Sequence, residues 1–265
     1  YTNIATIPHQ VMQQKNADFI DYGVMPEVQV RMKNSLLTVV SWNQWSHRNY
    51  PQIMPNAFNN VKEFTDNDFS RNFISYKYYW NSGRVEVKSA YFHERQNYFL
   101  ESYTSNGNPV SQMNTLNKSD VFRQLADLQQ DLFKSWKLYA KIQWDSENVT
   151  STDYDNDYDY DLGRKKRNIL SFYAVVDGNI YRDLDLRLTL RNDIVSRDVT
   201  PVASQRNEIA VQSNGFKSAG FFPTATLVYR MPFVKGLSFN AGYSHNYRNP
   251  TLNDLYWNPG GNENL

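Results

Sequence analysis

Alternating aspartates form the clearest chemical signal in the chain. Asp153, Asp155, Asp157, Asp159 and Asp161 occupy every second position of one short stretch. In an extended backbone these carboxylates project to the same side, because successive residues point to opposite faces. Clustered carboxylate oxygens suit Ca²⁺, so the stretch predicts a structural calcium site in a loop. The alternative is a solvated acidic loop that the basic residues at 164–167 partly neutralise.

The sequence contains no other metal-binding or catalytic motif. The acidic stretch is not an EF-hand, because Tyr158 stands where that motif needs glycine and Arg164 where it needs glutamate. The four histidines lack the spacing of a zinc hydrolase, and with no cysteine the chain can form neither disulfides nor thiolate metal sites. A glycine-rich phosphate loop and a nucleophile elbow are also absent. The sequence therefore predicts no enzyme activity and no required cofactor.

Charge and hydropathy exclude two classes of protein. The chain has 28 Lys and Arg residues against 27 Asp and Glu, a net charge of +1, which argues against nucleic-acid binding. Mean hydropathy is −0.68, and no stretch approaches the roughly 18 consecutive apolar residues that a membrane-spanning helix needs. Aromatic residues make up 15% of the chain. Its apolar character is therefore carried by rings and by alternating positions, not by long aliphatic runs.

Strands must position these residues, because apolar side chains recur with a period of two. The pattern is strictest from Trp136 to Trp144 and from Leu184 to Leu190, where every even position is apolar and most positions between are charged or polar. Strict alternation is the signature of a strand with one apolar face. Shorter versions occur at 74–80, 85–88, 170–176, 225–229 and 237–244. We predict about ten strands of about ten residues each.

The connections between the predicted strands alternate in length. Short turns are predicted at 33–35, 81–83, 127–133, 177–179 and 232–236. Long polar connections are predicted at 48–70, 101–118, 145–165 and 194–220. Short turns at one end and long loops at the other are typical of an outer-membrane β-barrel, with periplasmic turns and extracellular loops.

A soluble β-sandwich would show the same alternation, with the apolar face as its core. A sandwich, however, gives no physical reason for short connections to lie at one end of the strands and long connections at the other. Trp136 and Trp144 bracket one predicted face about 22–27 Å apart, which suits two interfacial aromatic girdles. We therefore predict an all-β fold, an antiparallel transmembrane β-barrel, with the even residues of 136–144 and of 184–190 facing lipid.

Three segments resemble a known family. Residues 238–265, from Ser238-Phe-Asn-Ala-Gly-Tyr through Tyr247-Arg-Asn-Pro-Thr to the closing Gly-Gly-Asn-Glu-Asn-Leu, resemble the barrel of TonB-dependent outer-membrane receptors. Residues 42–54 (WNQWSHRNYPQIM) and 80–98 (WNSGRVEVKSAYFHERQNY) are similar to strands in the vitamin B12 receptor-like branch of Bacteroidetes.

The resemblance implies a 22-stranded barrel, of which this chain holds about ten strands and neither the plug domain nor its TonB box. It places 249–265 outside the cell, and hence 1–21 as well. The implied partners are TonB acting through the plug, outer-membrane lipid and lipopolysaccharide, a small-molecule chelate and a surface lipoprotein. B12 receptors also order extracellular loops with calcium held by aspartate clusters, which supports the calcium hypothesis in kind.

Rings and amides on the long loops are the predicted ligand contacts: Trp45, Tyr50, Tyr256, Trp257, Asn258 and Asn262. Such a surface suits a corrinoid, whose macrocycle has flat apolar area and amide edges. The alternative is that the rings anchor the membrane interface and the asparagines build turns. A siderophore or haem would enter through the same barrel. Two alternatives belong to other functional classes: a passive porin and an omptin-like protease. The protease would need paired His and carboxylate residues, and the sequence shows no such arrangement.

Overall fold

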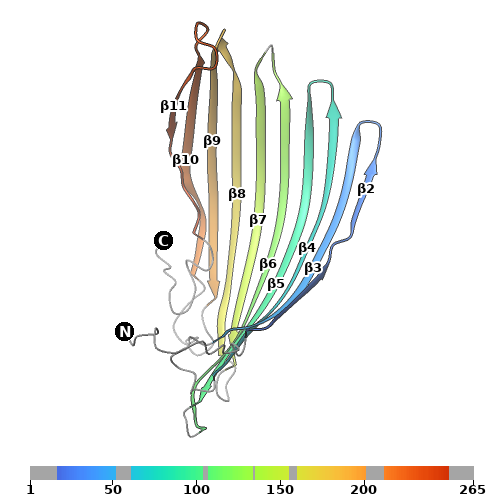
Figure 1. The fold of residues 1–265 in the computed structure, drawn as a ribbon, viewed down its shortest axis with the longest axis vertical. Helices are drawn as coiled ribbons and strands as arrows, with labels where there is room; N and C mark the ends of the chain where they lie inside the picture. The colour runs from blue at the N-terminus through green and yellow to red at the C-terminus, as the bar shows by residue number, and fades with distance from the viewer. Residues whose placement is uncertain are drawn as a thin grey trace, which may run out of the picture.

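The computed structural model describes residues 17–51, 61–103, 107–133, 135–154, 160–200 and 212–250. They form one antiparallel sheet of eleven strands (Figure 1). The strands are β1 Phe19–Val24, β2 Glu27–Arg31, β3 Ser35–Asn49, β4 Val61–Trp80, β5 Gly83–Tyr103, β6 Pro109–Asp131, β7 Lys137–Asp153, β8 Tyr160–Tyr181, β9 Leu184–Thr200, β10 Gln212–Arg230 and β11 Ser238–Ser244. None of the described residues forms a helix long and apolar enough to cross a membrane.

The strands follow one another in chain order, each hydrogen-bonded to the next. The exception is the first edge, where β1 and β2 both pair with β3, β1 opposite 43–48 and β2 opposite 36–40. These two strands therefore occupy one position, interrupted at Met25 and Pro26, because proline cannot donate to a ladder. Eleven strands thus fill ten positions. The expectation of an all-β antiparallel sheet of about ten strands is confirmed.

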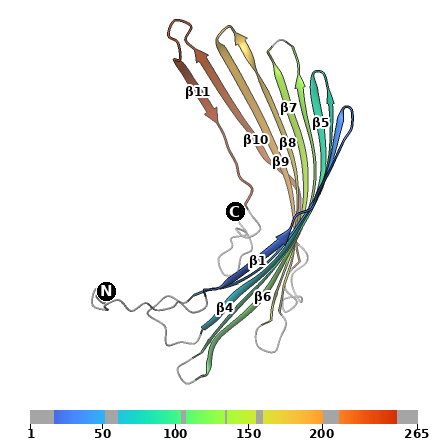
Figure 2. The same cartoon turned by 45° about the vertical axis from the view of Figure 1, so that its right-hand side comes forward.

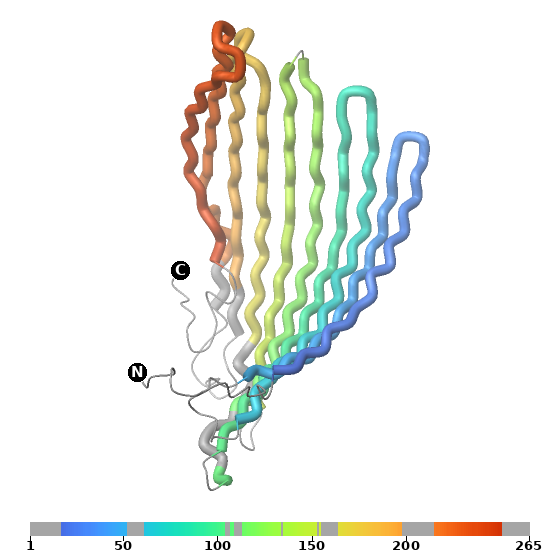
Figure 3. Tube along the Cα trace, viewed as in Figure 1, coloured from blue at the N-terminus to red at the C-terminus, as the bar shows by residue number. Residues whose placement is uncertain are grey.

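Short turns gather at one end of the sheet, as Figures 1 and 3 show, and the longer connections lie at the other end. The strands are longer than predicted, reaching 23 residues in β6. The connections expected at 48–70, 101–118, 145–165 and 194–220 therefore shrink to 50–60, 104–108, 154–159 and 201–211. The alternation of apolar and polar residues stops before the strands end, and backbone pairing continues through polar residues beyond it.

Two predicted turns lie elsewhere. Residues 177–179 are inside β8, and the turn is made by Arg182, whose φ is 43°, and Asp183. Gly178 serves packing instead, because a Cβ there would overlap the ring of Trp136. Residues 127–131 likewise belong to β6, and the turn spans 132–136. Trp136 accordingly precedes β7 instead of starting it.

The sheet curves, and its two faces differ (Figure 2). Asn249 and Pro250, which lie on the concave side, contact Asp193 and Arg167, so residues of the same parity point to the concave face. The opposite parity carries the apolar side chains: Leu188, 46% exposed, stands in one row with Val176 and Ala225. Thr189 points to the concave face with Val175 and Thr224. The predicted register of β9 is confirmed.

The apolar side chains of the convex face form a band. On β9 the band extends from Leu184 to Ile194, interrupted by Asn192, whose amide is hydrogen-bonded to Ser218 and to the carbonyl of Gly220. The ten steps from Leu184 to Ile194, at about 3.3 Å each and tilted by about 40°, span roughly 25 Å, the height of the lipid-facing band of an outer-membrane barrel.

Candidate functional site

The concave face carries arginine and carboxylate pairs in which the carboxylates have little exposure to solvent. Arg123 on β6 donates from Nε and Nη2 to the two carboxylate oxygens of Asp145 on β7, at 2.7 and 2.8 Å. Gln143 adds a third hydrogen bond to Asp145 at 2.8 Å. Asp145 is only 5% exposed. These two-pronged contacts hold β6 and β7 in register on the polar side.

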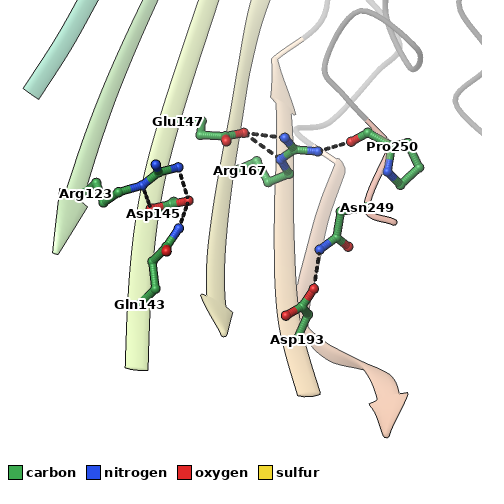
Figure 4. A network of polar contacts seen from close by, with 8 residues as sticks. All are labelled: Arg123, Gln143, Asp145, Glu147, Arg167, Asp193, Asn249 and Pro250. Carbon is green, nitrogen blue, oxygen red and sulfur yellow. Dashed lines mark hydrogen bonds and ion pairs between the residues drawn. The ribbon is translucent and has the colours of Figure 1, made fainter. Parts of the chain in front are cut away.

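A second pair on this face reaches the segment that follows β11. Arg167 on β8 contacts Glu147 on β7, with Nη2 at 2.5 Å from the carboxylate oxygen, and also donates to the backbone carbonyl of Pro250 (Figure 4). On β9, Asp193 is completely buried and accepts from Arg191 at 2.5 Å and from Asn249 at 2.8 Å. The polar wall thus binds the backbone and an amide of residues far along the chain.

Residues 245–250, here called the inward segment, leave the sheet instead of continuing β11. The last contact at the sheet edge is the His245 amide donating to the Pro223 carbonyl at 3.1 Å. Tyr247 then stacks on Phe222, with ring centroids 5.2 Å apart and planes 10° apart. With Asn249 and Pro250 bound as above, the inward segment is attached to β8, β9 and β10 across the concave face. It leads directly into 251–265, where four predicted ligand contacts lie outside the described residues.

Nearer the short turns, one carboxylate lies close to several cationic side chains. Glu86 on β5 accepts a hydrogen bond from the Ser75 hydroxyl at 2.5 Å and lies 3.5 to 3.6 Å from the cationic groups of Lys77, Arg84 and Lys88. Arg84 is also 3.7 Å from Asp127. Charged side chains therefore recur along the concave face, between buried apolar residues such as Val40 and Ile169, which stand in the same row as Arg123 and Asp145.

The predicted ligand contacts that are described lie at the end of the sheet with the long connections. Trp45 is in β3, on the convex face, where it stacks on Tyr22 at 5.6 Å. Tyr50, just after β3, lies with its hydroxyl 3.3 Å from that of Thr65 on β4. Tyr256, Trp257, Asn258 and Asn262 lie outside the described residues. Ligand contact by all six stays a prediction.

Tyr98 is a residue that sequence reasoning missed at this end. It lies on β5 far beyond the apolar band, and its hydroxyl donates to Glu63 on β4 at 2.9 Å. Burial, and then the hydrogen bond and charge of Glu63, raise the pKa of Tyr98 to about 12. Tyr98 therefore stays a neutral donor at any physiological pH.

The acidic stretch is only partly described. The backbone of Asp153 pairs with Tyr160 and that of Asp161 with Thr152, so the ends of the stretch close the β7–β8 hairpin. Asp155, Asp157 and Asp159 lie outside the described residues. Within the described part of the chain, no group of three or more His, Asp or Glu side chains is placed to hold a metal ion. The calcium site therefore stays a prediction.

The concave network was also missed, for a physical reason. Arg123, Asp145, Arg167 and Asp193 sit at positions that alternation assigns to the polar face of a strand, so their side was predictable. Which arginine meets which carboxylate depends on the register of neighbouring strands, and that is set by pairing across the sheet.

One comparison with known proteins gives a match. The family model described as "TonB dependent receptor-like, beta-barrel" matches residues 28–265, which is most of the chain and includes all of β3 to β11. No curated protein shows significant similarity to the chain.

Proposed function

The chain belongs to the TonB-dependent receptor-like β-barrel family, and on this premise we propose that its cargo is a corrinoid such as cobalamin. Members of the family are transporters of the bacterial outer membrane that depend on TonB for energy, and they are not enzymes. This excludes the omptin-like protease and the passive porin. The match over 28–265 carries energised outer-membrane transport. The corrinoid cargo is proposed from the rings, hydroxyl groups and amides at the extracellular end.

The chemistry of the extracellular end supports a cargo with polar edges. Tyr50, just after β3, and Tyr98 on β5 each place a ring and a hydroxyl group beside β4 on the concave side, at the end where a cargo would enter. Ser151 donates to the side-chain oxygen of Asn117 at 2.7 Å on the same face. A corrinoid offers flat apolar area fringed by amides, which matches rings beside hydroxyl and amide groups. The rings and amides of 256–262 would complete this surface.

We also propose that further strands and a plug domain complete the receptor. The two ends of the described sheet, β1 with β2 and β11, each have a partner on one side only. Unpaired edges inside a bilayer leave backbone groups unsatisfied, so a barrel must close. In this proposal the surface lipoprotein and TonB would act on the complete receptor, the latter through its plug.

Uptake by cells that carry the complete receptor tests the cargo. We expect uptake of radiolabelled cobalamin to need both the receptor and TonB, and to be insensitive to excess ferric siderophore or haem. Absence of receptor-dependent cobalamin uptake, together with TonB-dependent uptake of a ferric siderophore or haem through the same receptor, would overturn the corrinoid proposal and favour the corresponding chelate. Family membership and energised transport would stand in that case.

A further inference from the structure

Three cations gather on the convex face, beyond the apolar band. Register places Lys118 of β6, Thr150 of β7 and Arg164 of β8 side by side in one row across the sheet. Lys166 stands in the next row, opposite Asn148. All of these positions point to the convex face, like the side chains of the apolar band, and the three cationic side chains are exposed. We call Lys118, Arg164 and Lys166 the basic cluster.

The basic cluster differs from Arg123, Arg167 and Arg191 of the concave face, which are paired with carboxylates. Among the described residues, no carboxylate lies within ion-pair distance of Lys118 or Lys166, and Arg164 donates to the neutral amide of Asn148. Asp120, in the row of Lys166, already accepts hydrogen bonds from Tyr91 at 2.5 Å and His93 at 2.7 Å. Asp198 holds the register position opposite Lys166 on β9. Asp120 also attracts Lys118 electrostatically, without an ion pair, so the three cations are only partly compensated.

The spacing of the cluster suits a phosphate group. Lys118 and Arg164 are two strands apart, about 10 Å, and Arg164 and Lys166 are about 7 Å apart along one strand. A phosphate above Thr150 would lie within reach of all three long side chains. A planar guanidinium with ammonium groups on either side is a combination that recognises phosphate oxygens.

The height of the cluster places it at the membrane surface. Phe122 and Trp144 pack edge to face at 5.9 Å on the same convex face, where aromatic side chains mark the interface with lipid headgroups. Lys118 lies four residues beyond Phe122 on β6. That is about 13 Å along a strand and about 10 Å in height at a tilt of about 40°. The cluster therefore stands at the level of headgroup phosphates.

A groove lies below the cluster on the same strands. Ala126, Ala140 and Ala174 from β6, β7 and β8 form its floor, and bulkier neighbours including Leu128, Ile142 and Phe172 form its walls, around about 410 Å³. Small residues side by side on a lipid-facing wall leave a hollow that an acyl chain can fill. All these strands are paired on both sides, so neither open edge contributes to the groove or the cluster.

We propose that the convex face binds one membrane lipid whose headgroup carries phosphate monoesters, with a phosphate on the basic cluster and an acyl chain in the alanine groove. Outer-leaflet lipopolysaccharide has this chemistry. The inference rests on the outer-membrane location of the family and not on the identity of the cargo. Charge attracts the headgroup, and the groove selects a lipid over a soluble phosphate.

Native mass spectrometry of the complete receptor in detergent tests the site, with bisphosphorylated lipid A as the probe. We expect the variant K118Q/R164Q/K166Q to raise the Kd of lipid A at least about tenfold, because it removes three charge-assisted contacts. The matched control K33Q/K137Q/K235Q also removes three exposed cations, at the short-turn end. It should change the Kd less than about twofold. The charge-preserving variant K118R/K166R should bind as the wild type does.

Two further ligands separate lipid from phosphate. Lipid A treated with phosphatase should bind the wild type as weakly as untreated lipid A binds the triple variant, and inorganic phosphate should fail to compete with lipid A. Equal binding by the triple variant and the wild type would overturn the proposal, as would undiminished binding of the dephosphorylated lipid or competition by inorganic phosphate. Heat-modifiable migration on gels verifies that each variant is folded. Cargo uptake by the triple variant should be unchanged, so a wrong cargo and a wrong lipid site give different results.

Discussion

In each buried ion pair on the concave face, the two charges compensate each other. The side chains of Arg167 and Glu147 are 7% and 14% exposed, and the arginine also holds the Pro250 carbonyl. A buried pair adds little stability compared with apolar replacements, but removal of one member leaves a charge without a partner. We therefore infer that these pairs fix the register of neighbouring strands and attach the inward segment to the sheet.

A double-mutant cycle tests this at Arg167. We expect Arg167→Leu in the complete receptor to lower the free energy of unfolding by about 3 kcal/mol, because Glu147 loses its partner. Combining it with Glu147→Leu should restore most of the loss. The exposed pair of Arg187 and Asp177 is the control, and Arg187→Leu should cost less than about 1 kcal/mol. Urea unfolding in lipid vesicles measures all of these. Equal costs at the two arginines would contradict the role of burial.

Tyr98 gives a pH dependence with a definite sign. Its pKa is about 12 in the folded chain and about 10 in an unfolded one, so folding favours the neutral phenol. The contribution is complete below pH 10 and is lost as the pH rises towards 12. The signal of Tyr98 is the part of the phenolate absorbance that the Tyr98→Phe variant lacks. We expect this signal to appear near pH 12 in the wild type and at lower pH in Glu63→Gln. A titration of that signal near pH 10 would show that Tyr98 is neither buried nor bound to Glu63.

At the scale of elements, the strands extend well past the membrane. β5 and β6 continue their pairing through polar residues up to Tyr103 and Pro109. Backbone hydrogen bonds do not depend on side-chain polarity, so a hairpin that starts in the lipid band can continue into water. The extracellular rim is therefore largely an extension of the sheet, with shorter connections than polarity alone suggested.

Arginine substitutions at neighbouring positions of β9 test which face meets lipid. Leu188→Arg should destabilise the complete receptor by about 2–4 kcal/mol, because it places a charge near the middle of the apolar band. Thr189→Arg, on the concave face, should have a mild effect. Spin labels at 188 and 189, probed with a lipid-soluble quencher, provide an independent measurement. Greater quenching at 189 than at 188 would mean that the faces are reversed.

Calcium binding by the acidic stretch is tested in the β7–β8 connection. Closely spaced carboxylates need a cation to lie together, so millimolar Ca²⁺ should protect 154–159 from proteolysis and a chelator should expose it. The variant D155N/D157N/D159N keeps side-chain size and removes three charges. It should abolish the protection without lowering barrel stability. Protection that persists in this variant would favour the solvated acidic loop.

At the scale of the whole molecule, the described sheet is an open, curved wall. Its strand path begins at β1 and ends at β11, and these two edges are not paired with each other. An edge in lipid leaves one row of backbone donors and acceptors without partners. Figure 2 shows the curvature of this wall, and the arginine and carboxylate pairs lie on its concave face.

The chain expressed by itself should therefore fail to insert as a stable monomer. We expect this 265-residue polypeptide to aggregate or to oligomerise through its edges in detergent, whereas the complete receptor should run as a heat-modifiable monomer. Gel mobility with and without heating, combined with light scattering, distinguishes the two behaviours. A folded monomer of the isolated chain would support a small closed barrel instead.

The fold class, the face of most strand residues and the number of strands could be predicted from the sequence, because side-chain alternation is a local property with a period of two, visible in runs such as Leu184 to Leu190. The ends of the strands, the position of Gly178 beneath Trp136 and the contacts of Arg167 with Glu147 and Pro250 became clear only from the folded chain. Folding also brought Lys118, Arg164 and Lys166 together. These contacts depend on the register between strands and on the path of the chain after β11, which are set by pairing and packing of distant segments and leave no local pattern in the sequence.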